Sequence, residues 1–372
     1  MEEWKEYRLG EVLTIKYGKD HKKLKEGNIP VYGSGGVMRY VNKAISHGPS
    51  LLIPRKGSLN NIIYSPSAFW TVDTMFWTQI NSDIANPLFL YYSICKKDFA
   101  ALNVGTAVPS LTVPVIEDIK ISLPDLDIQS KICAILKSLD DKIELNRKIN
   151  SNLEEQAKAL FKSWFIDFEP FKDGKFVDSE FGMIPERWNM MSFESFISES
   201  QDKAMVGTYP AYSVTNNGIT PRTEKFKKQL SKATSKEKIL RKNDLVFGMS
   251  RQILNWGIMQ DEIGSVSSAY HVYKIDKERT CPTYLRYFIK GYESYFRDLI
   301  GTAAREGQSL DKGALMNKKL LVPSKEILRS FIQHVTTIEN TISLFKSQCR
   351  RLSTLRDTLL PRLMSGEIEV RS

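Results

Sequence analysis

The second half of this chain repeats the first half in the same order. The residue pairs that carry the repeat stand 199 positions apart, and they include Ser110 and Ser309, Lys120 and Lys319, Pro124 and Pro323, Ile143 and Ile342, and Leu160 and Leu359. Solenoid repeats are about 20 to 50 residues long, so each copy here corresponds to a whole domain followed by a helix. The repeat predicts two similar halves related by a pseudo-twofold axis. Such a layout suits a partner or ligand that itself comes in two halves.

The composition is that of a folded protein with ordinary cores. The chain has 372 residues, of which 42% are hydrophobic and 26% charged, enough for two or three domains. No apolar run approaches the roughly 20 residues that cross a bilayer, and the acidic, polar N-terminus is no signal peptide. We therefore expect a cytoplasmic protein with no membrane partner. The four cysteines (Cys95, Cys133, Cys281 and Cys349) are far apart, which favours reduced, mostly buried thiols over disulfides or a zinc site.

The chain divides into four segments, and the fold class is α/β (α+β). Residues 1–122 and 169–322 mix short β-rich runs with Gly, Pro and Asn punctuation, and the second of these ranges begins with a linker. Strands are predicted at 50–53, 61–64, 74–77, 245–247 and 270–273, and helices at 87–101 and 283–297. Residues 123–168 and 323–372 each form a long helix. The sequence thus predicts two similar globular domains joined by two long helices.

The two long helices, about 127–165 and 325–364, carry apolar residues at steps of three or four, which is the seam of a coiled coil. Asp127 is the expected N-cap of the first helix, and Pro361 is expected to kink or end the second. The first seam includes Ile128, Ile132, Ile135, Leu139 and Ile143, and Asn146 interrupts it. Neither helix can bury its stripe alone, so we expect the two to pack against each other in antiparallel orientation, with a globular domain at each end.

Motifs of catalysis are missing from the sequence. There is no GxxxxGK[ST] loop, no GxGxxG after a strand and no GxSxG elbow, and His21, His47, His271 and His334 show no metal-ligand spacing. The run Asn86-Pro87-Leu88-Phe89 is similar to a signature of amino-methyltransferases, but a proline in the first turn of a helix explains it equally well. The sequence indicates a binding protein and not an enzyme.

Positive charge is concentrated in both globular segments. The formal net charge is +10, and residues 201–251 hold eleven Lys or Arg against four Asp or Glu. A smaller cluster in the first segment consists of Lys16, Lys19, Lys22, Lys23 and Lys25. One such run could simply keep a surface soluble. Two patches in matching domains favour a phosphate backbone as the ligand.

Several motifs follow one another along the chain. They are Trp4 to Glu11 with its echo Ile184 to Trp188, the run Leu52-Ile53-Pro54-Arg55-Lys56-Gly57, the stretch Gly105 to Leu111, and Leu123-Pro124 with Gln129 and Ile132. In this order they resemble the specificity (S) subunit of type I restriction–modification systems. The second copy departs from the pattern, because it has no glutamine at the corresponding place and has Gly248-Met249-Ser250-Arg251 in place of the Pro-Arg-Lys-Gly run.

The resemblance implies a non-catalytic subunit that recognises a split DNA sequence, one half-site per target-recognition domain, with the paired helices setting the gap. It also implies that the helices dock two methyltransferase (M) subunits and that motor/nuclease (R) subunits complete the complex. S-adenosylmethionine, ATP and Mg would belong to those partners, so this chain is assigned no cofactor.

Side chains near the glycine-rich loops are the candidates for contact with double-stranded DNA. Lysine and arginine supply contacts to phosphates, Arg pairs with guanine, and Asn or Gln pairs with adenine. The candidates in the first domain are Lys22, Lys23, Arg39, Tyr40, Arg55, Lys56, Ser58, Asn60 and Asn61. Those in the second are Asn216, Asn217, Arg222, Lys225, Lys227, Lys228, Lys232, Arg251, Gln252 and Asn255.

Two other interpretations stay open at this point. The chain could be the recognition subunit of another class of restriction–modification enzyme, which would share the scaffold. It could also be a coiled-coil interaction scaffold whose basic patches bind acidic proteins. Retention on double-stranded DNA that falls steeply with salt separates the DNA-binding interpretations from the scaffold.

Overall fold

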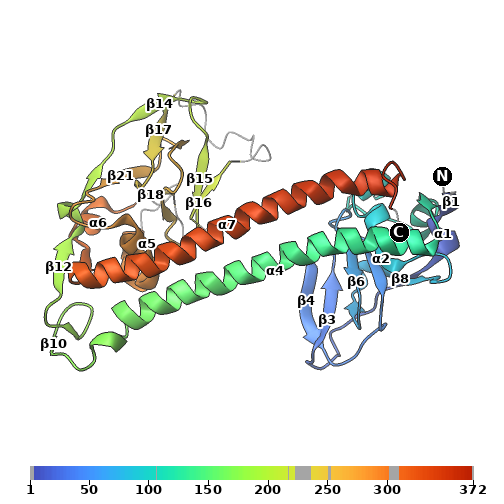
Figure 1. The fold of residues 1–372 in the computed structure, drawn as a ribbon, viewed down its shortest axis with the longest axis horizontal. Helices are drawn as coiled ribbons and strands as arrows, with labels where there is room; N and C mark the ends of the chain where they lie inside the picture. Colours follow the sequence, from blue (N-terminus) through green and yellow to red (C-terminus); the bar gives the residue numbers. More distant parts are fainter. Residues whose placement is uncertain are drawn as a thin grey trace. The chain divides into compact units, whose positions relative to one another are not determined.

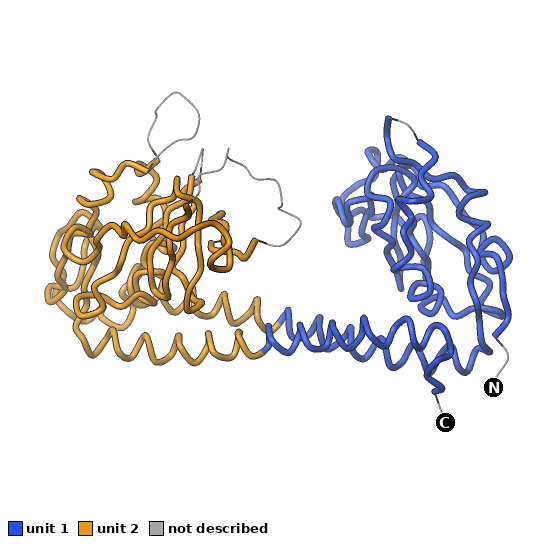
Figure 2. The backbone as a smooth tube through the Cα atoms, turned by 90° about the horizontal axis from the view of Figure 1, so that it is seen from above, with its two compact units in different colours: residues 1–148, 345–372 blue, residues 149–344 orange. Residues whose placement is uncertain are grey.

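The computed structural model describes residues 4–105, 107–216, 218–222, 236–249, 253–300 and 310–370. The chain forms two compact units, one made of residues 1–148 and 345–372 and the other of residues 149–344 (Figure 2). Each unit contains one globular domain and a stretch of both long helices. The units are described separately below.

The globular part of the first unit opens and closes on one strand pair, β1 (Lys5–Arg8) with β9 (Lys120–Leu123), in antiparallel register. Between them lie a four-stranded and a three-stranded sheet. The first has the order β2 (Leu13–Tyr17), β8 (Met75–Ile80), β5 (Ser50–Pro54), β6 (Ile63–Ser65), and the second β4 (Gly36–Val41), β3 (Ile29–Gly33), β7 (Trp70–Thr71). The helices are α1 (Leu9–Val12), α2 (Pro87–Ile94) and α3 (Val113–Glu117).

Strand β5 is buried on both faces because it separates two cores. Successive side chains of a strand point to opposite sides. Accordingly Leu51 and Ile53 lie in a core that also holds α2, whereas Leu52 lies in a smaller core under β3 and β7. The side-chain of every β5 residue is therefore hidden from water, which fits a sequence of continuous apolar character.

The second unit repeats this plan. Strand β12 (Asn189–Ser192) pairs with β22 (Lys319–Val322), and the four-stranded sheet has the order β13 (Ile197–Glu199), β21 (His271–Ile275), β18 (Leu245–Phe247), β19 (Trp256–Ile258). The remaining strands are β14 (Lys203–Met205), β17 (Lys236–Arg241) and β20 (Ile263–Val266) in one sheet, the hairpin β15 (Tyr212–Thr215) and β16 (Gly218–Pro221), and the pair β10 (Phe176–Val177) and β11 (Ile184–Pro185). The helices are α5 (Pro282–Gly291) and α6 (Lys312–Asn317).

The internal repeat is confirmed by the four-stranded sheet and the closing strand pair of each unit. Leu245 and Phe247 of β18 lie in one core and Val246 in another, as the alternating residues of β5 do in the first unit. Helices α2 and α5 both begin at a proline, but both are shorter than predicted. The predicted helix at 87–101 ends at Ile94 and is followed by a 3₁₀ turn at Phe99–Leu102, and the one at 283–297 is α5 followed by a 3₁₀ turn at Glu293–Leu299.

The long helices are α4 (Leu126–Phe165) and α7 (Lys325–Met364), close to their predicted bounds (Figure 1). Asp127 is not the N-cap of α4. The carboxylate of Asp125 accepts the Ile128 amide at 2.9 Å, and Asp127 forms an ion pair with Lys131 within the first turns. Pro361 lies inside α7 and does not end it.

Contacts along the seam show that α4 and α7 run antiparallel within the first unit. Asp140 forms an ion pair with Arg356, and the Asn146 side-chain amide donates a hydrogen bond to Gln348 at 2.8 Å. Residue numbers therefore rise along α4 in the direction in which they fall along α7. In the second unit the stripe becomes aromatic, with ring centroids of Phe165 and Phe331 4.8 Å apart. The predicted antiparallel pairing is confirmed.

The predicted assignment of Ile135 to the seam is wrong. Ile135 is 37% exposed, whereas its neighbour Leu136 is fully buried. Apolar residues stand at both positions. Steps of seven residues from the buried Gln129 lead to Leu136 and then to Ile143, so Leu136 is the residue that belongs to the seam. Asn146 is fully buried in the seam, as expected.

Candidate DNA interface

Two loops of the first unit meet at the tip of the β3–β4 hairpin. The turn Gly33 to Gly36 lies against the loop that follows β5, because the Asn61 side-chain amide donates to the Ser34 carbonyl at 2.8 Å. Gly57 has φ +91°, and a Cβ at that position would stand 2.8 Å from Ser34 Oγ. Only glycine therefore fits there without strain. The side chains on the two loops are held at one surface.

Arg55 leaves β5 at this surface and lies over an aromatic ring. Its guanidinium carbon is 5.4 Å from the ring centroid of Tyr17, and Nη1 is 3.4 Å from the Asp73 carbonyl. A cation over a ring is attracted by the ring quadrupole, which limits the directions that Arg55 can take. These contacts engage few of the five guanidinium donors, so a paired contact to a guanine edge is still available.

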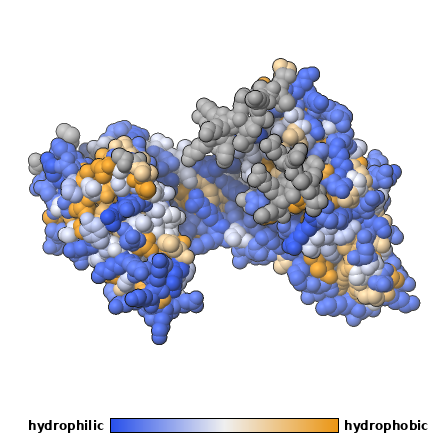
Figure 3. All heavy atoms as spheres, turned by 180° about the vertical axis from the view of Figure 1, so that it is seen from behind, coloured by the Kyte–Doolittle hydropathy of each residue, from blue (hydrophilic) through white to orange (hydrophobic). Residues whose placement is uncertain are grey.

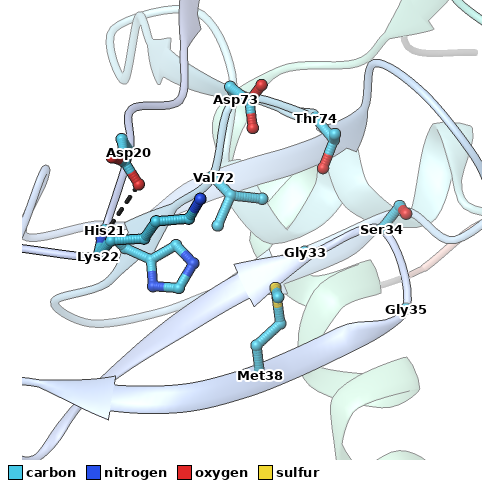
Figure 4. A pocket seen from close by; sticks show the side chains of 10 residues that line it. All are labelled: Asp20, His21, Lys22, Gly33, Ser34, Gly35, Met38, Val72, Asp73 and Thr74. Atoms are coloured by element: carbon cyan, nitrogen blue, oxygen red, sulfur yellow. Dashed lines mark hydrogen bonds between the residues drawn. The ribbon is translucent and has the colours of Figure 1, made fainter.

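A hollow of about 660 Å³ lies beside the hairpin tip (Figure 4). His21 and Lys22 enter it from one side, and Ser34 and Thr74 present hydroxyls on the other, with Met38 beneath. Nδ1 of His21 is buried and has no hydrogen-bond partner among the residues that the structure describes. Asp20 accepts the Lys22 amide at 3.0 Å, and that bond lowers the pKa of the Asp20 carboxyl. The lining thus offers both donors and acceptors.

The lysines of the first basic cluster surround this region and are exposed. Lys22 and Lys23 lie in the segment after β2, and Lys16, Lys19 and Lys25 flank them. Long cations on a flexible stem suit phosphates, which demand charge and little geometry. Exposed apolar side chains accompany them on the β3–β4 hairpin: Val37 is 48%, Met38 59% and Tyr40 54% exposed. Hydrophobic atoms interrupt the hydrophilic surface of each unit in the space-filling view (Figure 3).

The other candidates of the first unit divide into exposed and engaged side chains. Lys56 and Ser58 are exposed. Arg39 is half-buried and donates to the Leu24 carbonyl at 3.0 Å. The Asn60 amide accepts from the Ala100 amide at 2.8 Å and donates to Asp98 at 3.1 Å, so it fixes the 3₁₀ turn. These contacts give Asn60 and Asn61 a structural role, and their selection as base readers stays a prediction.

The second unit presents a similar face in its described part. Asn216 is exposed at the turn between β15 and β16. Arg222, which follows β16, donates a hydrogen bond from Nε to Ser213 Oγ at 3.1 Å. Asn255, just before β19, donates to the Met249 carbonyl at 2.7 Å within its own loop, whereas Asn61 of the first unit donates to the Ser34 carbonyl of the β3–β4 turn. Met249 is 45% exposed. The candidates Asn217, Lys225, Lys227, Lys228, Lys232, Arg251 and Gln252 lie outside the described residues.

Sequence reasoning missed Tyr17, which supports Arg55, and His21, Ser34 and Thr74, which line the hollow. An aromatic residue at a strand end beside a lysine cluster is a signal for Tyr17. No sequence signal places residues 34 and 74 together, because their proximity comes from the pairing of β3 with β7.

The described residues contain no group of three or more His, Cys, Asp or Glu placed to hold a metal ion, and none of their helices is long and apolar enough to cross a membrane. The four cysteines are free thiols; Cys133 is buried, and the others are half-buried. Burial raises the pKa of Cys95 to about 11 and that of Cys133 to about 12, which keeps both thiols protonated and poorly reactive.

Comparison with known proteins bears on the identity of this chain. Residues 1–155 match the family described as "Type I restriction modification DNA specificity domain". The type I restriction enzyme MjaIX specificity subunit of Methanocaldococcus jannaschii is 26% identical over 91% of this chain and 84% of its own length. The HindI specificity subunit of Haemophilus influenzae is 25% identical over 99% of this chain and 100% of its own length.

The fold has a solved counterpart. The crystal structure of a type I restriction–modification S subunit from M. genitalium matches all of this chain and 97% of that chain, with a TM-score of 0.63 and 13% identity. At that identity the match concerns the fold, and it bears out two domains joined by long helices. Together with the sequence matches, it confirms the resemblance predicted from the motifs.

Proposed function

We propose that this chain, a type I restriction–modification specificity subunit, recognises a two-part DNA sequence, with one recognition domain on each half-site. DNA sequence recognition is the shared function of the proteins it matches. The observation that carries the two-part target is the repeat of the whole domain, with the same order of strands in the four-stranded sheet and the same closing strand pair in both units. A chain with two similar binding domains is suited to a ligand that has two binding sites.

Different residues on the candidate DNA-binding face of the first unit would supply affinity and sequence specificity. Its exposed lysines supply contacts to phosphates, and the strength of such contacts falls with salt. Arg55, restrained by Tyr17, is the residue we expect to read a base edge. The hollow beside it offers a recess with both polar and apolar lining for a neighbouring group of the DNA. The second unit would read its half-site with the loops around β15–β16 and β18–β19.

Catalysis would then reside in partner subunits. We propose that α4 and α7 dock two methyltransferase subunits, one for each half of the repeat, and that motor/nuclease subunits join to complete the complex in the cytoplasm. S-adenosylmethionine, ATP and Mg would be bound by those partners. The gap between half-sites would be set by the length of the paired helices.

Retention on DNA tests this function against its alternatives. The chain, purified with the methyltransferase subunit of its own system, should bind duplex DNA with an affinity that falls steeply between low and physiological salt. It should also prefer one sequence over scrambled duplexes. An interaction scaffold would bind acidic proteins and show no preference among duplexes. A recognition subunit of another restriction class would keep the preference without assembling with motor/nuclease subunits.

A further inference from the structure

Each recognition domain is joined to a long helix by a tyrosine–carboxylate hydrogen bond at the same place in the repeat. In the first unit, the Tyr92 hydroxyl on α2 donates to Asp140 Oδ2 on α4 at 2.7 Å. In the second, the Tyr287 hydroxyl on α5 donates to Glu339 Oε1 on α7 at 3.0 Å. Both tyrosines are the sixth residue of a helix that begins at proline, and Asp140 and Glu339 are 199 positions apart, which is the offset of the repeat.

An arginine completes each contact, and it comes from a different element in each unit. Arg356 of α7 binds Asp140 at 2.6 Å in the first unit, and Arg286 of α5 binds Glu339 in the second. The carboxylates are 33% and 25% exposed and the arginines 25% and 27%, so these pairs are partly shielded from water. The charge partner changed between copies, whereas the tyrosine–carboxylate bond is present in both.

Another polar link between domain and helix is present in one copy only. Gln129 of α4 accepts the Asn86 amide at 2.8 Å and donates to the Ile84 carbonyl at 3.1 Å. Its counterpart in the repeat is Leu328, which packs against the apolar core of the second unit. A polar anchor that merely holds the domain in place can therefore be replaced by apolar packing. The tyrosine–carboxylate bond has not been replaced.

A hydrogen bond fixes the relative orientation of two helices more strictly than apolar packing does. The face of α2 that carries Phe89 and Leu90 shares a core with Leu136 of α4 and Leu360 of α7, and such contact is not directional. A bond from a rigid phenol to a carboxylate fixes one angle of α2 on the long helix. Burial and the Asp140 bond raise the pKa of Tyr92 well above its ordinary value, so the phenol stays a donor.

We infer that Tyr92 with Asp140, and Tyr287 with Glu339, are positioning residues that set the angle of each recognition domain on its helix and thereby restrict the gap between the half-sites. This inference rests on the proposed function, because it concerns the spacing of a two-part target. These residues contact no base. They would act through the placement of the surface that carries Arg55 and its equivalent.

The test measures gap preference separately from half-site preference. The assembled methyltransferase complex is bound to duplexes that carry its mapped target with the natural gap, or with a gap one base pair longer or shorter. Tyr92→Phe and Asp140→Ala should each lower the preference for the natural gap roughly three- to tenfold, the equivalent of one hydrogen bond, with half-site preference unchanged. Tyr287→Phe should do the same from the other side.

Tyr91→Phe is the matched control. Tyr91 is the preceding residue of α2, and its hydroxyl makes no hydrogen bond to any residue that the structure describes, so its loss should leave gap preference at the wild-type level. The inference is overturned if Tyr92→Phe and Asp140→Ala behave like Tyr91→Phe, or if they weaken all duplexes equally. A wild-type complex without any sequence preference would instead overturn the proposed function.

Discussion

At the scale of single residues, Arg55 has the strongest structural case for reading a base. The Tyr17 ring restrains its guanidinium, and that preorganisation reduces the entropy lost on binding. We expect Arg55→Ala to cost about 1–3 kcal/mol and to relax preference at one position of one half-site. The measurement is the affinity of the assembled complex for targets varied one base at a time.

The neighbouring Lys56 provides the control for Arg55. Lys56 is exposed, so we expect Lys56→Ala to weaken binding to every sequence and to reduce the salt slope by about one unit. If Arg55→Ala also lowered affinity uniformly, its role would be electrostatic only. The corresponding predictions for Arg251→Ala and Lys228→Ala in the second unit concern residues outside the described ranges, and they stay predictions.

Asn60 illustrates that a loop residue can have a structural role that composition does not reveal. An asparagine beside a glycine-rich loop is a reasonable candidate for an adenine contact, yet its amide is occupied by Asp98 and Ala100. Asn60→Ala should therefore lower the free energy of unfolding by about 1–2 kcal/mol and leave base preference unchanged. Ser58→Ala, a change at an exposed site two residues away, should stay within about 0.5 kcal/mol of wild type. A loss of preference for adenine at one position in Asn60→Ala would contradict this role.

At the scale of elements, the sequence predicted the long helices almost to the residue and the short ones less well. Period and length identify α4 and α7 because the stripe continues over many turns. The ends of α2 and α5 depend instead on how the chain packs after Ile94 and Gly291, which local propensity does not determine. The loop surface was predictable in kind, but the contact between Asn61 and Ser34 depends on sheet pairing.

Two adjacent residues test the seam. Leu136 is fully buried between the helices and Ile135 is 37% exposed. Leu136→Asp would bury a charge and should cost several kcal/mol, with loss of thermal stability and of partner binding. Ile135→Asp should cost less than about 1 kcal/mol. Thermal unfolding of both variants checks this pair, and an equal loss of stability in the two would show the seam to be misassigned.

At the scale of the whole molecule, the repeat predicts a separation of tasks between domains and helices. About seven residues inserted into both helices, after Lys148 and after Leu344, would keep the heptad seam in step and add about 10 Å of helix. We expect the gap of the DNA target to lengthen by roughly three base pairs, with both half-sites intact. The insertion must be matched, because the helices pair. Altered half-sites with an unchanged gap would exclude the helices as the determinant of spacing.

Recognition of a two-part sequence is the central claim, and methylation mapping tests it most directly. The chain is produced with the methyltransferase subunit of its own system in a host that lacks other DNA methylation, and the modified bases are located across the genome. We predict methylation at a single motif of two half-sites with a fixed gap, and relaxed choice in only one half when Arg55 is replaced by alanine. A continuous motif, or methylation whose sequence does not depend on this chain, would contradict the account.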